Sequence, residues 1–315
     1  YVNPRSPWPI QLDPVTIEPG EMHELHMGIT VMLGGDDFKD EEKIQKTVKE
    51  AFLDSLEEYQ IRKNKISSNL RGKLHPYFQD SSYVIALNKS ALTLQSNWRA
   101  AADLLKHDGI IPSYSDKDFY GFWAWDSWKH AAALVHIDTA LAKNQVRAMY
   151  DYMTDEGFIP DCIFRDTTQE KHNFRNTKPP LSGWAVWEIY KETQDQDFLR
   201  EMYPKILKQH QWWYVYRDFD KDGLCEYGSQ DGSLEAAKWE SGMDNAVRFD
   251  QTKMLNQGDS IYTMDQESVD LNSYLLQEKL ILASMSMVLK DTTTARAMKG
   301  ETKSLLRKIQ SQFYD

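Results

Sequence analysis

The sequence predicts a mainly α-helical protein, and two observations support that fold class. From about residue 40 almost to the end, apolar residues recur at the i, i+3, i+4, i+7 spacing of amphipathic helices. Loops that contain Gly and Pro separate these segments, at 107–122, 154–180, 218–243 and 255–264. Because the helices alternate with long loops, the pattern favours helical hairpins around a common centre over a βαβ fold.

Residues 7–36 differ from the rest of the chain. Pro19-Gly20 is a turn signal, and residues 25–31 alternate between apolar and small or polar side chains with the period of a strand. Residues 15–17 are a candidate partner strand. One hairpin is marginal alone in water, so we expect it to pack on the helices or to be the remnant of a larger β domain.

The helical pattern predicts five long helices. The first begins near Asp40 and has an apolar face that includes Phe52, Leu56 and Tyr59. The others are expected at 141–153, 198–213, 269–289 and 292–313. Because the sequence opens in a strand pattern and stops after a helix, we expect it to be a fragment of a larger protein.

Composition and charge exclude several classes of partner. The 315 residues are 41% hydrophobic, which is enough for a sizeable core in one large domain or two smaller ones. The net charge is -11 and no basic stripe is present, which argues against binding to nucleic acid or to an anionic membrane. No run of 18 apolar residues could span a bilayer. A neutral small substrate is compatible with this balance.

The segment from Phe122 to Trp128 combines a carboxylate with three indole rings. Flat rings stack on the C–H faces of a pyranose, and a carboxylate accepts its hydroxyls, so Trp123, Trp125 and Asp126 are candidate sugar-binding residues. In the alternative interpretation Trp125 and Trp128 are core residues on one helix face. Asp126 would then be a first-turn acid that stabilises the helix dipole.

A second segment, Trp239–Asp244, places two carboxylates beside a Trp and a Gly. One carboxylic acid could protonate a glycosidic oxygen while a second carboxylate activates water. Gly242 would let the backbone approach the substrate closely. The alternative is a surface turn with a half-buried Trp239.

The segment 218–226 resembles the first half of a calcium-binding loop. Asp218, Asp220 and Asp222 alternate and are followed by Gly223. An EF-hand requires Glu at its twelfth position, where this chain has Ser229, so the remaining ligands must come from elsewhere. An acidic, solvated turn is the alternative.

Residues 173–184 carry two further cations. Pro179-Pro180 stiffens the entry to a helix that we expect to begin near Leu181. Arg175 and Lys178 could bind substrate hydroxyls or pair with acids. In the alternative interpretation the segment is a helix-entry loop.

Five blocks of the sequence occur in a characteristic order: WAWDSWKHA (123–131), RNTKPPLSGWAVWEIY (175–190), RDFDKDGLCEYG (217–228), WESGMD (239–244) and QESVD (266–270). Together they resemble glycoside hydrolase family 63, in its bacterial α-glucosidase type, with family 37 trehalases as more distant relatives. The blocks occur in the same order as in that family, and the resemblance covers roughly residues 90–290.

The resemblance implies an (α/α)6 toroid preceded by a β-sandwich. Residues 1–36 would be the end of the sandwich, 37–89 a linker helix region and 90–315 the first part of the toroid. The family's enzymes are inverting α-glucosidases, so the resemblance implies hydrolysis of α-linked glucosides of oligosaccharides. It also favours a periplasmic or secreted location.

The resemblance assigns roles to individual residues. Asp244 matches the general acid, Asp126 matches the acid that binds the sugar in the −1 subsite, and Trp123, Trp125 and Trp239 would line the pocket. Glu240, Arg175 and Lys178 complete the expected substrate-binding set, although Glu240 has a structural role as its alternative. The family's general base lies further downstream than residue 315, so we expect the isolated chain to be inactive.

The resemblance also implies a structural Ca2+ site. Its ligands would be Asp218, Asp220, Asp222, the Leu224 carbonyl and Glu267. The bacterial relatives carry a long insertion between this loop and WESGxD, whereas the connection here is short, which leaves the linkage preference open. Two other functions are considered: a non-catalytic carbohydrate-binding helical protein and a trehalase-like hydrolase.

Overall fold

The computed structural model describes residues 41–78, 80–115, 119–168, 170–256, 258 and 261–314, together with 16, 19 and 20. Pro19 and Gly20 form the predicted turn, but the strands expected at 15–17 and 25–31 lie outside the described residues, apart from Thr16. The chain divides into two compact units, residues 1–65 and 66–315, and the division falls within the linker helix region predicted for 37–89.

Helix α1 (Glu41–Lys73) begins in the first unit, close to the predicted start at Asp40. Between residues 49 and 65 every side chain is exposed. Phe52, Leu56 and Tyr59, which mark the predicted apolar face, are therefore exposed. Helical spacing identifies such a face but does not show whether anything covers it.

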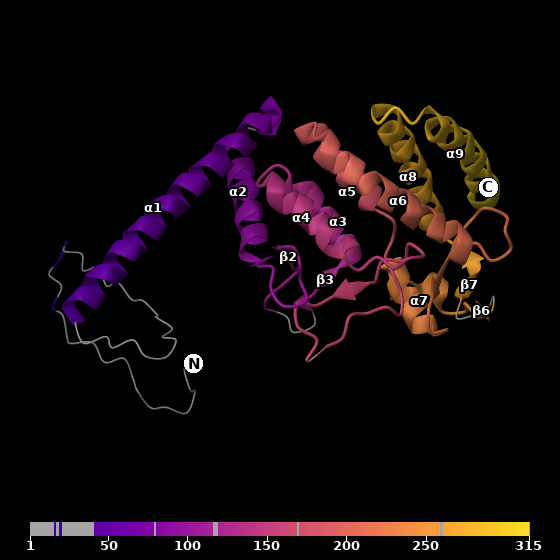
Figure 1. Ribbon diagram of the computed structural model, residues 1–315, viewed down its shortest axis with the longest axis horizontal. Helices are drawn as coiled ribbons and strands as arrows, with labels where there is room; N and C mark the ends of the chain where they lie inside the picture. The colour runs from indigo at the N-terminus through magenta and orange to yellow at the C-terminus, as the bar shows by residue number, and fades with distance from the viewer. Residues whose placement is uncertain are drawn as a thin grey trace. The chain divides into compact units, whose positions relative to one another are not determined.

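The second unit is built from helical hairpins (Figure 1). Helices α3, α5 and α8 pack in series, and each also packs against the helix that follows it, α4, α6 or α9. The helices are α2 (Ser81–Ser96), α3 (Ala124–Leu134), α4 (Thr139–Tyr150), α5 (Ser182–Thr193), α6 (Gln196–Tyr216), α7 (Leu234–Ser241), α8 (Val269–Val288) and α9 (Thr292–Phe313), with short 3-10 turns at 76–78 and 247–249.

Local sequence explains where these helices begin. Side chains of Asp138, Asp195 and Asp291 accept hydrogen bonds from backbone N–H groups in the first turns of α4, α6 and α9, and Ser233 does so for α7. Such N-caps satisfy donors that otherwise have no partner within the helix.

Four of the five predicted helices match α4, α6, α8 and α9 in position.

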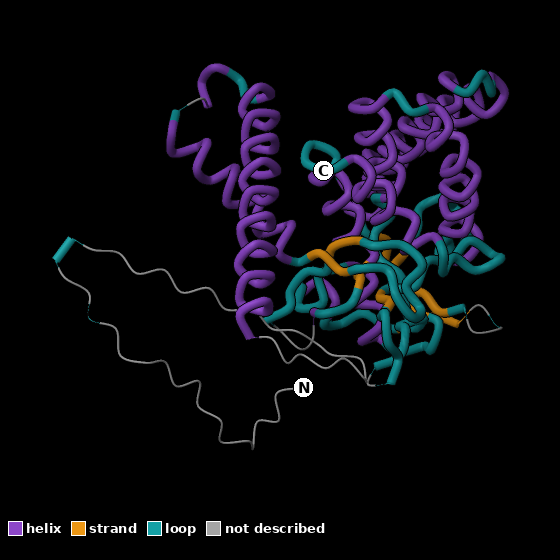
Figure 2. Tube along the Cα trace, turned by 60° about the vertical axis from the view of Figure 1, so that its left-hand side comes forward, coloured by secondary structure: helices purple, strands orange, loops and turns teal. Residues whose placement is uncertain are grey.

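Short antiparallel strands lie with the long loops at one end of the hairpins (Figure 2). Strand β1 (Trp98–Arg99) pairs with β2 (Gly109–Ile110), and β3 (Phe122–Trp123) pairs with β4 (Cys162–Ile163). A three-stranded sheet has the order β5 (Glu226–Ser229), β7 (Tyr262–Glu267), β6 (Met254–Asn256). The sequence predicted loops over most of these segments, because strands of two to six residues carry too little periodic signal.

Two large clusters of buried side chains, and a small one made of Ile66, Leu70 and Ala91, hold this unit together. The larger one joins α3, α4, α5, α6 and α8 and contains the fully buried Trp128, Met149 and Leu199. The second lies under the three-stranded sheet and contains Trp213 and Tyr227. Among the described residues, none of the helices has the length and apolarity to cross a bilayer.

Candidate active site

A cavity of about 820 Å3 brings most of the predicted site residues together. Four segments line it: 119–126, 161–164, 170–178 and 239–244. Its wall includes seven of the residues singled out from the sequence: Trp123, Trp125, Asp126, Arg175, Lys178, Trp239 and Asp244.

The strand pair β3–β4 positions Asp126. Strand β3 ends where α3 begins, opposite the first residue of β4, and the Ala124 N–H donates to the Asp161 carbonyl at 2.8 Å. Asp126 therefore lies in the first turn of α3, where the backbone amides favour a carboxylate. Trp128 belongs to the core, whereas Trp123 and Trp125 are half-buried and line the cavity.

A left-handed turn positions Asp244. Helix α7 ends at Ser241, and Gly242 follows with φ 68°. A Cβ at Gly242 would overlap the indole ring of Trp125. Gly242 also lines the cavity, so its predicted close approach to substrate stays a prediction. Asp244 follows two residues later and is exposed.

Glu240 does not line the cavity. It is fully buried, and its carboxylate accepts two hydrogen bonds from the Arg217 guanidinium, at 2.7 and 2.9 Å. It also accepts the backbone N–H groups of Gly228 at 2.7 Å and Thr177 at 3.2 Å. Glu240 therefore has the structural role that was its alternative, and not the expected contact with substrate. The reason is that protein donors already occupy both oxygens of this carboxylate.

Lys178 is buried at the cavity wall. Its ammonium group lies 3.2 Å from Asp161 Oδ1 and donates to the Trp239 carbonyl. Asp161 also accepts the Asn173 amide at 3.0 Å. Burial raises the pKa of Asp161 to about 6, and Lys178 partly offsets that effect. Lys178 therefore connects Asp161, which directly precedes β4, to Trp239 in the last turn of α7.

Sequence reasoning missed Asp161, although a signal was present. It is the only charged residue in the otherwise apolar run from Phe158 to Phe164. A charge in such a run is rarely buried unless it is paired.

Arg175 takes the second of its two predicted roles, since it pairs with acids. Its guanidinium lies 2.5 Å from Asp231 and 3.2 Å from Glu235. It also stacks on the Trp239 ring, with 5.0 Å between its Cζ and the ring centroid. The pairs and the stacking hold Trp239 against the cavity.

The predicted calcium loop is a separate cluster that does not line the cavity. Carboxylate oxygens of Asp218, Asp220 and Asp222 lie within 4.8 Å of one another. Asp218 is buried, and its Oδ1 has no hydrogen-bond partner among the described residues. Such an orphaned carboxylate oxygen, next to two further carboxylates, fits a hard cation such as Ca2+.

Glu226 belongs to the same cluster and was missed from the sequence. It is buried on β5 and lies opposite Glu267 on β7. Burial raises the pKa of Glu226 to about 8, and the nearby Asp218, Glu267 and Asp220 add to the increase. The crowding of five acids around one loop is a further reason why the donor set fits a cation.

Comparison with known proteins identifies the family. The model of the mannosylglycerate hydrolase MGH1-like glycoside hydrolase domain matches residues 119–315, which include every residue that lines the cavity. The chain belongs to this family.

Two curated relatives are similar over part of their length. Mannosylglycerate hydrolase of Thermus thermophilus is 26% identical over 183 aligned residues, in a match that covers 52% of this chain and 40% of that protein. Trehalase of Dictyostelium discoideum is 26% identical over 235 aligned residues, in a match that covers 62% of this chain and 39% of that protein. The chain therefore spans about 40% of the length of each.

A solved structure shows the same fold. GH63 mannosylglycerate hydrolase from Thermus thermophilus, in complex with Tris, superimposes with a TM-score of 0.57 and 18% sequence identity, over 71% of this chain and 65% of that one. Two predictions are thereby confirmed. The chain resembles family 63, and its mainly α fold corresponds to part of an (α/α)6 toroid.

Proposed function

We propose that the protein is an inverting α-glycosidase of small α-linked glycosides. The observation that carries this proposal is the shared cavity: Asp126 and Asp244 open into one space of about 820 Å3 together with Trp123, Trp125 and Trp239. Indole rings can stack on a sugar, and carboxylates can bind its hydroxyls or move a proton.

The two acids have different tasks in this proposal. Asp244 follows the Gly242 turn, is exposed to the cavity and donates the proton to the glycosidic oxygen. Asp126 accepts hydroxyls of the glycone. Inversion needs a second carboxylate to activate water, and we assign that base to no residue of this chain.

Substrates with an acidic aglycone, such as mannosylglycerate, are the first candidates. Of the lysine and arginine side chains that line the cavity, Arg175 and Lys178 are neutralised by carboxylates. Lys171 makes no ion pair with any described residue. It is therefore available to a substrate carboxylate. The hydrolase from Thermus, whose name gives this substrate, is consistent with that choice.

Neutral α-glucosides form the second group of candidates, and the likeness to a trehalase supports them. A panel of mannosylglycerate, trehalose, kojibiose, nigerose and maltose separates the two groups. If Lys171 binds the aglycone carboxylate, Lys171→Met raises KM for mannosylglycerate and leaves KM for any neutral substrate unchanged.

The deciding experiment measures hydrolysis by the full-length protein. We expect Asp244→Asn to lower kcat about 10²- to 10⁴-fold, as for loss of a general acid. Asp250→Asn is the matched control, because this exposed acid on the same segment does not line the cavity. Proton NMR should show the β-anomer first. Equal kcat in both variants, or the α-anomer first, contradicts the proposal.

A non-catalytic carbohydrate-binding protein is the candidate from another class. It would bind sugars in the same cavity, and binding would weaken in Asp126→Asn. The complete protein would release no sugar from any member of the panel. Turnover that depends on Asp244 excludes this candidate.

We further propose that the acidic cluster holds a structural Ca2+. Asp218, Asp220, Asp222, the Leu224 carbonyl and Glu267 are the ligands expected from the resemblance, and we add Glu226 for its place between Asp218 and Glu267. The orphaned Asp218 Oδ1 supports the proposal. When bound, the ion would neutralise the clustered carboxylates and tie the loop after α6 to the β5–β7 pair.

A further inference from the structure

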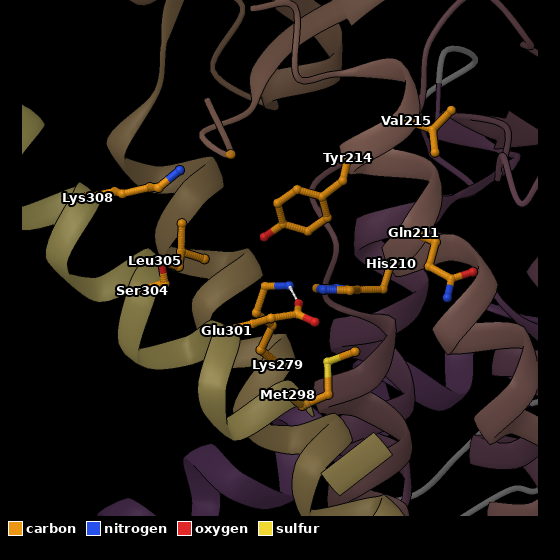
Figure 3. A pocket seen from close by; sticks show the side chains of 11 residues that line it. His210, Gln211, Tyr214, Val215, Lys279, Met298, Glu301, Ser304, Leu305 and Lys308 are labelled. Atoms are coloured by element: carbon orange, nitrogen blue, oxygen red, sulfur yellow. Dashed lines mark hydrogen bonds and ion pairs between the residues drawn. The ribbon is translucent and has the colours of Figure 1, made fainter. Parts of the chain in front are cut away.

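A second cavity, of about 500 Å3, lies between α6, α8 and α9 (Figure 3). It shares no lining residue with the candidate active site. His210 and Tyr214 come from one face of α6, Lys279 comes from α8, and α9 contributes a row of side chains that includes Glu301 and Lys308. Its volume is within the range of small-molecule sites, about 300–1,000 Å3.

Two polar groups at this cavity lack partners within the described part of the chain. His210 is 1% exposed, and its Nδ1 lies 2.7 Å from Glu278 Oε2, which fixes the orientation of the ring. The other ring nitrogen, Nε2, has no hydrogen-bond partner, and the Tyr214 hydroxyl has none either. Buried polar groups are nearly always hydrogen-bonded, so both indicate a missing polar neighbour.

The charges that line the cavity have both signs. Lys279 is buried and pairs with Glu301 at 2.5 Å, and its ammonium group lies 4.2 Å from the centroid of the Tyr214 ring. Lys308 adds a second cation, whereas Glu278 lies behind His210 and does not line the cavity. An anion would meet the Glu301 carboxylate here and a cation would meet two lysines, so the lining disfavours a strongly charged ligand of either sign.

We infer that this cavity binds a neutral, hydroxyl-rich molecule of monosaccharide size. A hydroxyl group both donates and accepts, so it can satisfy His210 Nε2 in either protonation state and also the Tyr214 hydroxyl. The apolar side chains of Met298 and Leu305 line the same space and can contact C–H groups of such a ligand. The inference does not depend on the proposed catalytic activity.

The test follows the methyl group of Met298, which lines the cavity and is 7% exposed. The complete protein carries 13C-labelled methionine methyl groups, and Met298→Leu assigns the signal. D-glucose and glycerol are titrated into an Asp126→Asn background, which weakens binding in the candidate active site. We expect a saturable shift of the Met298 signal. The apparent Kd should rise about fivefold in Tyr214→Phe, because the ligand loses one hydrogen bond.

Ser304→Trp is a second variant that blocks the same cavity from an exposed position on α9. It should abolish the Met298 shift while leaving the thermal midpoint of unfolding unchanged, so a folding defect is not mistaken for lost binding. Three results would overturn the inference: no saturable shift with either polyol, the same Kd in Tyr214→Phe, or a shift caused by inorganic phosphate and not by the polyols.

Discussion

At the scale of single residues, two acids four positions apart have opposite surroundings. Glu240 lies inside α7 and is enclosed by Arg217 and backbone N–H groups, whereas Asp244 follows the helix and opens into the cavity. The left-handed turn at Gly242 causes the difference, because it redirects the chain between them. The motif identifies both acids, but only the turn separates their surroundings.

Substitution of Gly242 should displace Asp244. Gly242→Ala puts a side chain at φ 68° and against the Trp125 indole, so the turn must shift. We expect kcat to fall by at least about tenfold, as for a misplaced catalytic group. Gly300→Ala is the control: no atom lies near its Cβ position inside α9, and it should stabilise the fold by about 0.5–1 kcal/mol. Unchanged kcat in Gly242→Ala would show that the turn does not position Asp244.

Asp161 should make stability depend on pH. Its folded pKa of about 6 lies above the ordinary 3.8, so folding takes up a proton between these values and stability falls as pH rises through that window. Asn cannot ionise. The free energy of unfolding of Asp161→Asn, relative to wild type, should therefore increase by roughly 2 kcal/mol between about pH 4 and pH 7. Urea unfolding at both pH values measures it, and a pH-independent difference would contradict the expectation.

At the scale of elements, the candidate active site and the acidic cluster both depend on short strand pairs that bring distant parts of the chain together. Strands β3 and β4 bring Asp161 beside the start of α3, and β5 and β7 bring Glu226 beside Glu267. These strands are short and have little periodic signal of their own. Their pairing depends on how the helices before and after them pack, which is why the sequence predicted loops at most of these positions.

Chelation tests the acidic cluster at this scale. If the cluster holds Ca2+, EDTA should lower the free energy of unfolding by about 3 kcal/mol relative to Ca2+ at roughly 100 times its Kd, and added Ca2+ should restore it. Asp218→Asn should lose this sensitivity. Asp197→Asn should keep it, because Asp197 is an exposed acid on α6 outside the cluster. If chelator leaves the thermal midpoint of unfolding unchanged, the cluster is a solvated acidic turn and not a Ca2+ site.

At the scale of the whole molecule, residues 66–315 should be stable without residues 1–65. The two units are compact separately, and the side chains of 49–65 are exposed. Deletion of 1–65 should change the free energy of unfolding by no more than about 0.5 kcal/mol. Deletion through residue 96 is the control. It also removes α2, with the buried Ala91 and the core contact of Leu94, and should cost more than about 2 kcal/mol. A large loss on the shorter deletion would contradict the division.

The sequence by itself determined the helical class, the family and two acids that line the candidate active site. Helical periodicity and five ordered motifs are local properties, so they are enough to name Asp126, Asp244 and the tryptophans around them. Only the tertiary structure decided that Glu240 is a buried partner of Arg217, that Asp161 pairs with Lys178, and that Glu226 joins the acidic cluster. The physical reason is that burial and charge pairing depend on residues far apart in the chain, which spacing along one helix does not reveal.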